Sequence, residues 1–186
     1  MAERGIRPAE GRDLDAVMGM LEVARGFMRR QGNPQWERSF PTRAELAGEQ
    51  RRGSLMCCEE EGRVIGCFVL APGPETCYLR IEGGKWLDDG PYFAVHRFAT
   101  LEQGRGVGSF MLEWLCGVAD SLRTDTHELN LPMRRLLEGH GFGCCGTIRL
   151  ANGESRLAYQ YLSPTHHPDR HRLPSRLPWR RGGLGR

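Results

Sequence analysis

A run of closely spaced glycines constrains this chain more than any other feature of its sequence. The segment reads Gln103-Gly104-Arg105-Gly106-Val107-Gly108. Residues 92–99 before it have the composition of a β-strand, and apolar residues recur at helical spacing over 106–122, which predicts the main amphipathic helix. A strand that leads through glycines into a helix presents bare backbone N–H groups and the positive end of the helix dipole to an anion. The segment therefore suits a pyrophosphate, to which Arg105 would add a charge-assisted contact.

Two common nucleotide-binding loops can be compared with this segment. A dinucleotide-binding loop has the spacing G-x-G-x-x-G and an acidic residue about 20 positions later, but Gly104, Gly106 and Gly108 are spaced differently. A P-loop ends in Gly-Lys-Ser/Thr, and Gly108-Ser109 lacks the lysine. Neither nucleotide-binding motif fits well, and a glycine cluster at a helix start often serves only to turn the chain.

The periodicity of the rest of the chain predicts a mixed sheet flanked by helices. Thr42, with Glu45 three residues later, forms a capping-box pattern, and Asp13 is a second candidate helix cap. We expect helices over 14–31, 42–52 and 131–138, and further strands over 6–9, 55–60, 63–70, 77–81, 122–127, 144–150 and 155–162. This order indicates an α/β (α+β) protein whose central mixed sheet carries helices on both faces.

Length and charge divide the chain into a folded domain and a basic tail. Of the 186 residues, we assign 1–162 to one domain and 163–186 to a C-terminal tail rich in proline and arginine. The tail has six arginines, one acidic residue and little apolar bulk, so we expect it to be disordered or draped over the domain. Because Trp179 is its only large aromatic residue, we do not expect it to bind nucleic acid.

Neither a membrane segment nor a metal site is expected. No run approaches the roughly 20 apolar residues that span a bilayer, and the N-terminus lacks the basic-then-apolar order of a signal peptide. The seven cysteines include no C-x-x-C pair, which favours buried thiols in a reducing compartment over a metal or redox site. We therefore predict a cytoplasmic protein, either a monomer or a homodimer.

The glycine segment and a second motif together resemble a known family. Gln103-x-x-Gly106-x-Gly108 is similar to the Q/R-x-x-G-x-G/A coenzyme A signature of the GNAT superfamily of N-acetyltransferases. Asn130-x-x-Met133-x-x-Leu136-Leu137-x-x-x-Gly141-Phe142 resembles that superfamily's N-x-x-A-x-x-L-Y-x-x-x-G-F segment. With a matching element order, the resemblance covers residues 5–162 and implies a GNAT-like fold whose mixed sheet is mostly antiparallel.

The resemblance also implies a cosubstrate and a reaction. Acetyl-CoA would bind along the glycine segment and between two splayed strands, and its acetyl group would pass to the amine of a small-molecule acceptor by direct attack in a ternary complex. The residues implied for coenzyme binding are Phe98, Ala99, Gln103, Gly104, Arg105, Gly106, Val107, Gly108, Asn130 and Met133. The chain further looks like a bacterial subgroup with G-N-P-Q-W at 32–36, G-G-x-W at 83–86, P-Y at 91–92, H-R at 96–97 and R-x-D-T-H at 123–127.

Three polar residues are candidates for catalysis. Acetyl transfer to an amine needs a base, and His96, which titrates near neutral pH, lies on the strand leading into the glycine segment, although a buried structural histidine also fits there. Asp125 and His127 share one strand face, so they can pair or orient the acceptor, and polar packing at a strand end explains them equally well. The family's usual acid, the tyrosine of its L-Y pair, is Leu137 here, which leaves the acid unassigned.

Three large aromatic residues are candidates for the acceptor pocket. Trp36, Trp86 and Tyr92 stand in loop or strand-start positions rather than in a periodic stripe, as residues lining a concave pocket often do, and core packing is the alternative. An apolar pocket with few fixed charges suits a small amine better than a histone tail. Because Leu137 removes a usual catalytic group, a non-catalytic coenzyme A sensor or protein-interaction module on the same fold is the competing function.

Overall fold

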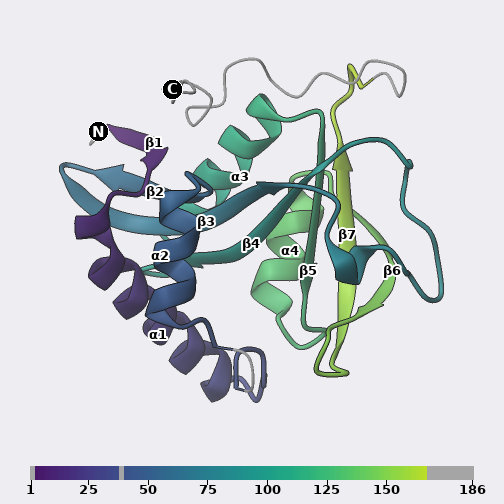
Figure 1. The fold of residues 1–186 in the computed structure, drawn as a ribbon, viewed down its shortest axis with the longest axis horizontal. Helices are drawn as coiled ribbons and strands as arrows, with labels where there is room; N and C mark the ends of the chain where they lie inside the picture. Colours follow the sequence, from purple (N-terminus) through teal and green to yellow (C-terminus); the bar gives the residue numbers. More distant parts are fainter. Residues whose placement is uncertain (1–2, 38–39, 167–186) are drawn as a thin grey trace, which may run out of the picture.

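The protein folds around a seven-stranded β-sheet (Figure 1). The computed structural model describes residues 3–37 and 40–166, so residues 167–186 of the predicted tail lie outside the described part of the chain. The strand order is β1-β2-β3-β4-β5-β7-β6, and neighbouring strands are antiparallel except for β4 and β5, which are parallel. The bounds are β1 (Arg4–Pro8), β2 (Leu55–Glu60), β3 (Arg63–Pro72), β4 (Phe93–Thr100), β5 (Ser121–Thr126), β6 (Gly143–Arg149) and β7 (Ser155–Leu162).

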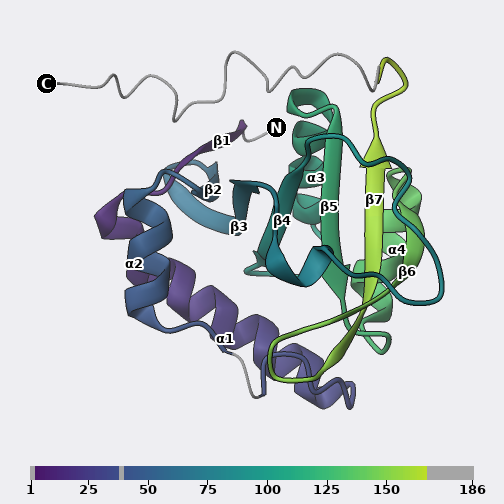
Figure 2. The same ribbon diagram turned by 45° about the vertical axis from the view of Figure 1, so that its right-hand side comes forward.

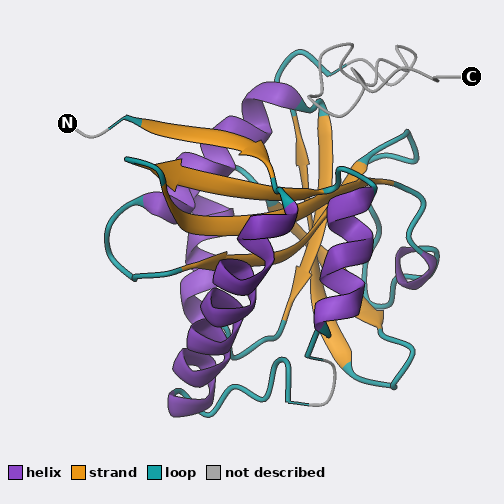
Figure 3. Ribbon diagram, turned by 60° about the vertical axis from the view of Figure 1, so that its left-hand side comes forward, coloured by secondary structure: helices purple, strands orange, loops and turns teal. Residues whose placement is uncertain are grey.

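Helices cover both faces of this sheet (Figure 3). In β2, Leu55 and Cys57 pack with α1 and α2, whereas Met56 and Cys58 pack with α3 on the opposite face, as strand alternation requires. The predicted fold class, a mixed and mostly antiparallel sheet between helices, is confirmed. None of the described helices is long and apolar enough to cross a membrane. The bounds are α1 (Leu14–Arg30), α2 (Arg43–Arg51), α3 (Val107–Val118) and α4 (Leu131–Gly139).

The sheet opens between its two parallel strands. β4 and β5 pair over only three positions, the last of which places Val95 opposite Thr124. Beyond Val95 the two strands diverge, as Figures 1 and 2 show. The register of β4 against β3 shifts in the same region, where Arg97 has a left-handed φ of 52°. Such a bulge bends a strand, and here it leaves an opening in the sheet next to β5.

The two predicted helix caps have different outcomes. Thr42 and Glu45 form the predicted capping box: the Thr42 hydroxyl accepts the N–H of Glu45 at 3.2 Å, and the Glu45 carboxylate accepts the N–H of Thr42 at 2.6 Å. Asp13 precedes α1, but its side chain makes no cap hydrogen bond to that helix, so the predicted cap is wrong. Its carboxylate instead pairs with Arg7 at 2.6 Å and accepts the N–H of Glu10 at 2.7 Å. Asp13 thus ties β1 to the start of α1.

One predicted strand and the predicted end of one helix are also wrong. The segment expected to form a strand over 77–81 begins with a 3-10 turn, η2 (Thr76–Tyr78), and forms no strand. Both edges of β3 are already paired, with β2 and β4. The segment instead buries Tyr78, and just after it Glu82 makes an isolated antiparallel bridge to Thr147 of the edge strand β6. The helix expected to reach residue 122 ends at Val118, because Ala119 is extended and Leu122 is a buried residue of β5.

A small aromatic core lies beneath the loop that joins β3 to β4. The Arg123 guanidinium from β5 lies 4.2 Å from the ring centroid of Trp86 and 4.1 Å from that of Tyr92. Its Nη2 donates to the carbonyl of Asp88 at 2.6 Å. These contacts hold the loop against β5, close to the opening in the sheet. The buried members of this core are Tyr78, Tyr92, Ala94, Ile148 and Ala158.

Candidate active site

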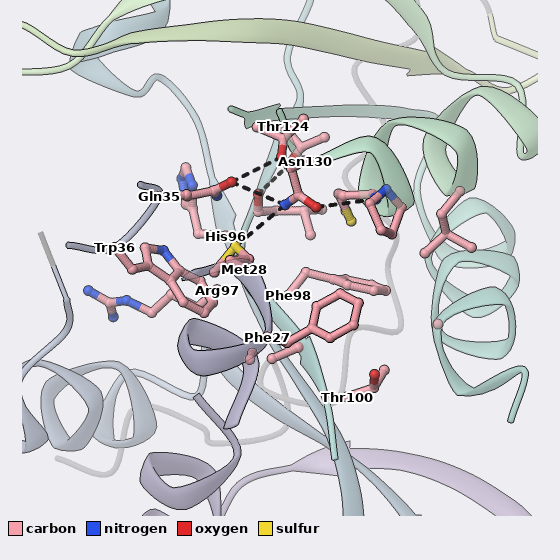
Figure 4. A pocket seen from close by; sticks show the side chains of 18 of the residues that line it. Phe27, Met28, Gln35, Trp36, His96, Arg97, Phe98, Thr100, Thr124 and Asn130 are labelled. Atoms are coloured by element: carbon pink, nitrogen blue, oxygen red, sulfur yellow. Dashed lines mark hydrogen bonds between the residues drawn. The ribbon is translucent and has the colours of Figure 1, made fainter. Parts of the chain in front are cut away.

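The divergence of β4 and β5 produces a continuous cleft of about 670 Å³. Its walls come from the C-terminal half of α1 and the loop after it, from β4 and β5, from the glycine loop 103–108 and from the start of α4. Figure 4 shows side chains from these elements converging on the cleft, including Phe27, His96, Phe98 and Asn130. The glycine loop and the leading catalytic candidate therefore line one cavity.

The glycine loop presents its backbone to this cleft. Gly104 and Gly106 have φ values of 79° and 71°, and Gly106 is the N-cap of α3. A Cβ atom at Gly104 would meet nothing within 4 Å, so backbone conformation rather than crowding favours glycine there. The N–H groups of residues 104–106 donate to no acceptor in the described part of the chain, and those of 107–109 have no partner within α3. Free N–H groups at a helix start fit the pyrophosphate of coenzyme A.

The long side chains of the loop already have partners within the protein. Arg105 pairs with Glu60 at 3.1 Å and with Glu102 at 3.4 Å. The Gln103 amide donates to the hydroxyl of Thr100 at 3.2 Å. Because two carboxylates hold Arg105, a contact between its guanidinium and the coenzyme stays a prediction.

Val107 and Gly108 connect the loop to the core. Val107 is buried among residues of the main cluster on the α3 face. A Cβ atom at Gly108 would lie 2.9 Å from Cδ2 of Leu136, so glycine allows α3 to approach α4 closely. Both residues line the cleft, and their packing fixes where the helix N-terminus lies.

The remaining coenzyme-binding candidates lie along the wall beside the loop. Phe98 lines the cleft and stacks on Phe68, with ring centroids 6.3 Å apart. Ala99, also a lining residue, is buried. Asn130 caps α4, since its side-chain oxygen accepts the N–H of Met133 at 3.4 Å, and both residues line the cleft. The structure thus brings all four together.

Gln35 links the two sides of the cleft. Its Oε1 accepts hydrogen bonds from the hydroxyl of Thr126 at 3.3 Å, the N–H of His127 at 3.2 Å and the amide of Asn130 at 3.1 Å. The amide of Asn130 also contacts the sulfur of Met28 at 3.7 Å. Figure 4 shows the interactions that join Gln35, Asn130 and Met28. This network ties the loop after α1 to the junction between β5 and α4.

His96 lies on the cleft wall beside a carboxylate. Its Nε2 is 3.3 Å from Oε1 of Glu75, and its ring centroid is 5.9 Å from that of Tyr78. Burial alone lowers the pKa of His96, but the interaction with Glu75 and the negative charge of Asp125 outweigh it and raise that pKa above its ordinary value. The same pairing lowers the pKa of Glu75. The pair therefore consists of an ionised carboxylate and a histidine whose basicity is increased.

Asp125 and His127 have different partners. Asp125 lines the cleft and accepts a hydrogen bond from the hydroxyl of Tyr78 at 2.7 Å. Burial and the charge of Asp125 raise the pKa of Tyr78 well above its usual value, so this phenol is protonated. The Nδ1 of His127 instead accepts the N–H of Leu129 at 3.2 Å, and burial with the nearby Arg156 lowers the His127 pKa. The structure brings Asp125, but not His127, to the lining of the cleft.

The three aromatic candidates for the acceptor pocket lie in different parts of the structure. Trp36 lines the cleft, with a left-handed φ of 69°. Trp86 and Tyr92 belong to the small aromatic core instead, and neither lines the cleft. The Trp86 indole donates to the carbonyl of Tyr78 at 2.9 Å, and the Tyr92 hydroxyl accepts the N–H of Glu75 at 2.9 Å. Both therefore support the residues that surround His96.

Several residues at this site were not predicted from the sequence. Tyr78 lies within the segment expected to be a strand, Glu75 lies just before that segment, and no motif marks either residue. Gln35 lies within the G-N-P-Q-W segment, so the subgroup resemblance contained a signal for it. Leu137, at the position of the usual acid, is fully buried in the main core. The described residues include no group of three or more His, Cys, Asp or Glu side chains that could hold a metal ion.

The fold and the cleft together define a class of protein. The split between β4 and β5 admits a long, thin group such as pantetheine, and the free N–H groups at the N-terminus of α3 suit the pyrophosphate to which pantetheine is attached. These are the requirements of a coenzyme A-dependent acyltransferase.

Comparisons with known proteins place the chain within that class. The model of the "Acetyltransferase (GNAT) family" matches residues 19–142. A GNAT family acetyltransferase from Streptococcus agalactiae is 32% identical and superposes with a TM-score of 0.81, over 86% of this chain and 95% of the other. The protein therefore belongs to the GNAT family of acetyltransferases.

More distant structures share the fold. A GNAT family acetyltransferase from Listeria monocytogenes is 17% identical, with a TM-score of 0.65 over 87% of this chain and 95% of the other. A ribosomal-protein-alanine N-acetyltransferase from Brucella melitensis is 21% identical, with a TM-score of 0.57 over 85% and 99% of the two chains. Comparison with curated protein sequences gives no significant match.

Proposed function

We propose that this acetyltransferase moves the acetyl group of acetyl-CoA to the amine of a small acceptor by direct attack in a ternary complex. The observation that carries the proposal is that His96, a histidine paired with a carboxylate, lines the same continuous cleft as the glycine loop. A cavity shared by a base and a coenzyme-binding loop can hold both substrates at once, which direct attack requires. Acetyl-CoA supplies the acetyl group as an activated thioester.

His96 and the groups around it have different roles in the proposed reaction. The acceptor attacks the thioester carbonyl as the neutral amine, and His96 accepts the proton that its nitrogen loses as the C–N bond forms. The C–S bond then breaks, and coenzyme A leaves as a thiolate that takes a proton from water. Asp125 receives an N–H of the amine, because Tyr78 occupies only Oδ1 and the described residues give Oδ2 no hydrogen-bond partner. The backbone N–H groups of the glycine loop hold the coenzyme in place. Positioning of both substrates and removal of one proton are thus assigned to groups present in the cleft.

The dimensions and charge of the cleft favour a small, positively charged amine. A volume of about 670 Å³ lies within the range of roughly 300 to 1,000 Å³ of small-molecule sites, and the thioester end of the coenzyme must share it. The carboxylates of Glu75 and Asp125 line the region around His96 and attract a cation. The Brucella protein is described as an N-acetyltransferase of a ribosomal protein, but at 21% identity its likeness to this chain supports only the fold.

We place this reaction in the cytoplasm. All seven cysteines are free. Burial raises the pKa of Cys57 to about 12 and that of Cys58 to about 11, so both are protonated and unreactive at neutral pH. Unpaired thiols of this kind fit a reducing compartment.

A non-catalytic coenzyme A sensor is the competing function. Leu137 packs in the main core, so the family's usual acid has no counterpart at its own position. A sensor would need the glycine loop but not the Glu75 and His96 pair. The pairing of these two residues in the cleft favours the enzyme.

The test is release of free thiol from acetyl-CoA across a panel of diamines, amino sugars, amino acids and peptides, with coenzyme binding measured by calorimetry. We expect turnover with at least one small cationic amine, and a loss of roughly a hundredfold or more in kcat for His96→Ala with coenzyme affinity retained. Tight coenzyme binding without turnover of any acceptor would favour the sensor. Undiminished turnover by His96→Ala would remove this residue from the mechanism.

A further inference from the structure

We propose that Glu75 is a positioning residue, which fixes the proton of neutral His96 on Nε2 and so leaves Nδ1 free to accept the proton of the attacking amine. The inference rests on the proposed function, in which His96 is the base. Glu75 lies between β3 and η2, in a loop that carries no recognised motif, and its carboxylate reaches the wall of the cleft.

The geometry of the pair determines which nitrogen carries the proton. Neutral imidazole has one N–H group and one lone pair, and an ionised carboxylate can only accept a hydrogen bond. Oε1 of Glu75 lies 3.3 Å from Nε2 of His96 as an ion-pair contact, and the negative charge of the carboxylate favours the tautomer that carries its N–H group on Nε2. The described residues provide no hydrogen-bond partner for Nδ1, and the His96 side chain is 29% exposed where it lines the cleft. The lone pair is therefore available to a substrate.

The backbone of Glu75 is itself held in place. Its N–H donates to the hydroxyl of Tyr92 at 2.9 Å, and the N–H of Gly73 donates to the carbonyl of Tyr92 at 3.0 Å. A Cβ atom at Gly73 would lie 2.6 Å from the Tyr92 ring, so the loop packs directly on this tyrosine. The Arg123 guanidinium lies over the same ring. Tyr92, predicted to bind the acceptor, instead fixes the residue that orients the base.

Other charged and titratable groups also face His96 or its carboxylate. Asp125 from β5 adds to the rise in the His96 pKa, and the neighbouring Arg97 opposes it. Tyr78 from η2 contacts the imidazole ring and holds Asp125 by its hydroxyl. Burial, with the charges of Asp125 and Glu75, raises the pKa of the Cys77 thiol to about 11, so Cys77 carries no charge at neutral pH. Glu75 is the member of this group within 3.3 Å of an imidazole nitrogen.

These contacts fix the sign of the pH dependence. The base must be neutral to act, so kcat/KM rises as the pH rises through the pKa of His96. Removing the charge of Glu75 removes the interaction that opposes burial, and the His96 pKa falls. The acid limb of the pH profile then moves to lower pH. Because a base of lower pKa is also weaker, the alkaline plateau of kcat/KM falls by roughly three- to tenfold.

The direct test is a histidine NMR titration of the full-length free protein, which needs no substrate. Long-range proton and nitrogen-15 spectra report the tautomer and pKa of His96, whose signals are assigned by their loss in His96→Ala. We expect the Nε2–H tautomer in the wild type, a lower His96 pKa in Glu75→Gln, and a smaller decrease in Tyr92→Phe. Glu82→Gln is the matched control, because Glu82 lies in the same loop but pairs with Arg149 at the surface. An Nδ1–H tautomer in the wild type, or an unchanged His96 pKa in Glu75→Gln, would overturn the inference.

Activity measurements separate this inference from the proposed function. With an acceptor found by the thiol-release panel, the acid limb of kcat/KM should move to lower pH in Glu75→Gln and stay in place in Glu82→Gln. A loss of activity in Glu75→Gln without movement of the limb would show a merely structural role and overturn the proposal. If the NMR results are as expected but His96→Ala keeps wild-type turnover, the assignment of His96 as the base fails, and the orientation of His96 by Glu75 is still supported.

Discussion

Replacing Gly106 with alanine places a side chain on a residue whose backbone is left-handed, with a φ of 71°. The new Cβ would meet no atom closer than Nη1 of Arg4, at 3.9 Å, so the cost comes from the backbone and is about 1 kcal/mol. Gly117→Ala is the matched control in the same helix, α3. Its Cβ also meets nothing within 4 Å, but Gly117 lies within the helix, where alanine is favoured by about 0.5 to 1 kcal/mol.

The two substitutions should therefore have opposite effects on stability. The free energies of unfolding of the two variants should differ by about 2 kcal/mol. With a urea m-value of about 2 kcal/mol/M, the midpoints of urea unfolding should lie about 1 M apart, with the wild type between them. Equal midpoints for the two variants would contradict the left-handed conformation of Gly106.

Coenzyme binding should separate the same two variants. A methyl group at Gly106 changes the loop whose N–H groups face the coenzyme, and a lost hydrogen bond to a charged group costs about 1.5 to 3 kcal/mol. We expect a Kd for coenzyme A at least about tenfold weaker in Gly106→Ala, measured by calorimetry, and an unchanged Kd in Gly117→Ala. Wild-type affinity in Gly106→Ala would refute the assignment of this loop to the pyrophosphate.

Three further predictions concern other parts of the fold. Gln35→Ala removes the acceptor of three hydrogen bonds and should lower the free energy of unfolding by about 1 to 3 kcal/mol in urea titrations, whereas Gln35→Glu, which keeps that oxygen, should recover most of the loss. Pairing with Arg7 lowers the pKa of Asp13, so the ion pair stabilises the fold at neutral pH and this stabilisation is lost as the pH falls through that pKa. Asp13→Asn should therefore be less stable than the wild type at pH 7, and the difference in unfolding free energy between them should shrink below about pH 4. A difference that stays constant with pH would contradict the pairing. Cys144 is exposed and should be the first cysteine of the native protein to react with a disulfide reagent. Cys67 is buried, its pKa is raised, and it should react only after unfolding. Rapid labelling that persists in Cys144→Ser would count against this order.

Short-range chemistry explains what the sequence predicted well. The capping box at Thr42 and Glu45 depends on residues three positions apart, and the glycine loop depends on the φ values of consecutive residues. Both features are encoded locally and were found where expected. The strand expected over 77–81 did not form, because β2 and β4 occupy both edges of β3 and this pairing is set by the whole sheet. Contact with the edge strand β6 is limited to the isolated bridge between Glu82 and Thr147.

The acceptor side of the cleft depends on contacts between distant residues. Tyr78 reaches Asp125, 47 positions later, and Gln35 reaches Asn130, 95 positions later. Alternation along the strand suggested that Asp125 and His127 act together, but the partner of Asp125 comes from a loop that the periodicity described as a strand. Local patterns could therefore nominate a histidine as the base but could not reveal the carboxylate beside it.

The three-position pairing of β4 with β5 also has a mechanical consequence. It is the one stretch of ladder that joins the β1 to β4 half of the described sheet to the β5, β7 and β6 half. A molecule bound in the gap contacts both halves of the sheet and holds them together. Saturating coenzyme should therefore stabilise the whole domain against unfolding. Amide exchange in β4 and β5 should then slow on coenzyme binding even at positions remote from the glycine loop. In this enzyme, binding of the cosubstrate would also complete the connection between the two halves of the sheet.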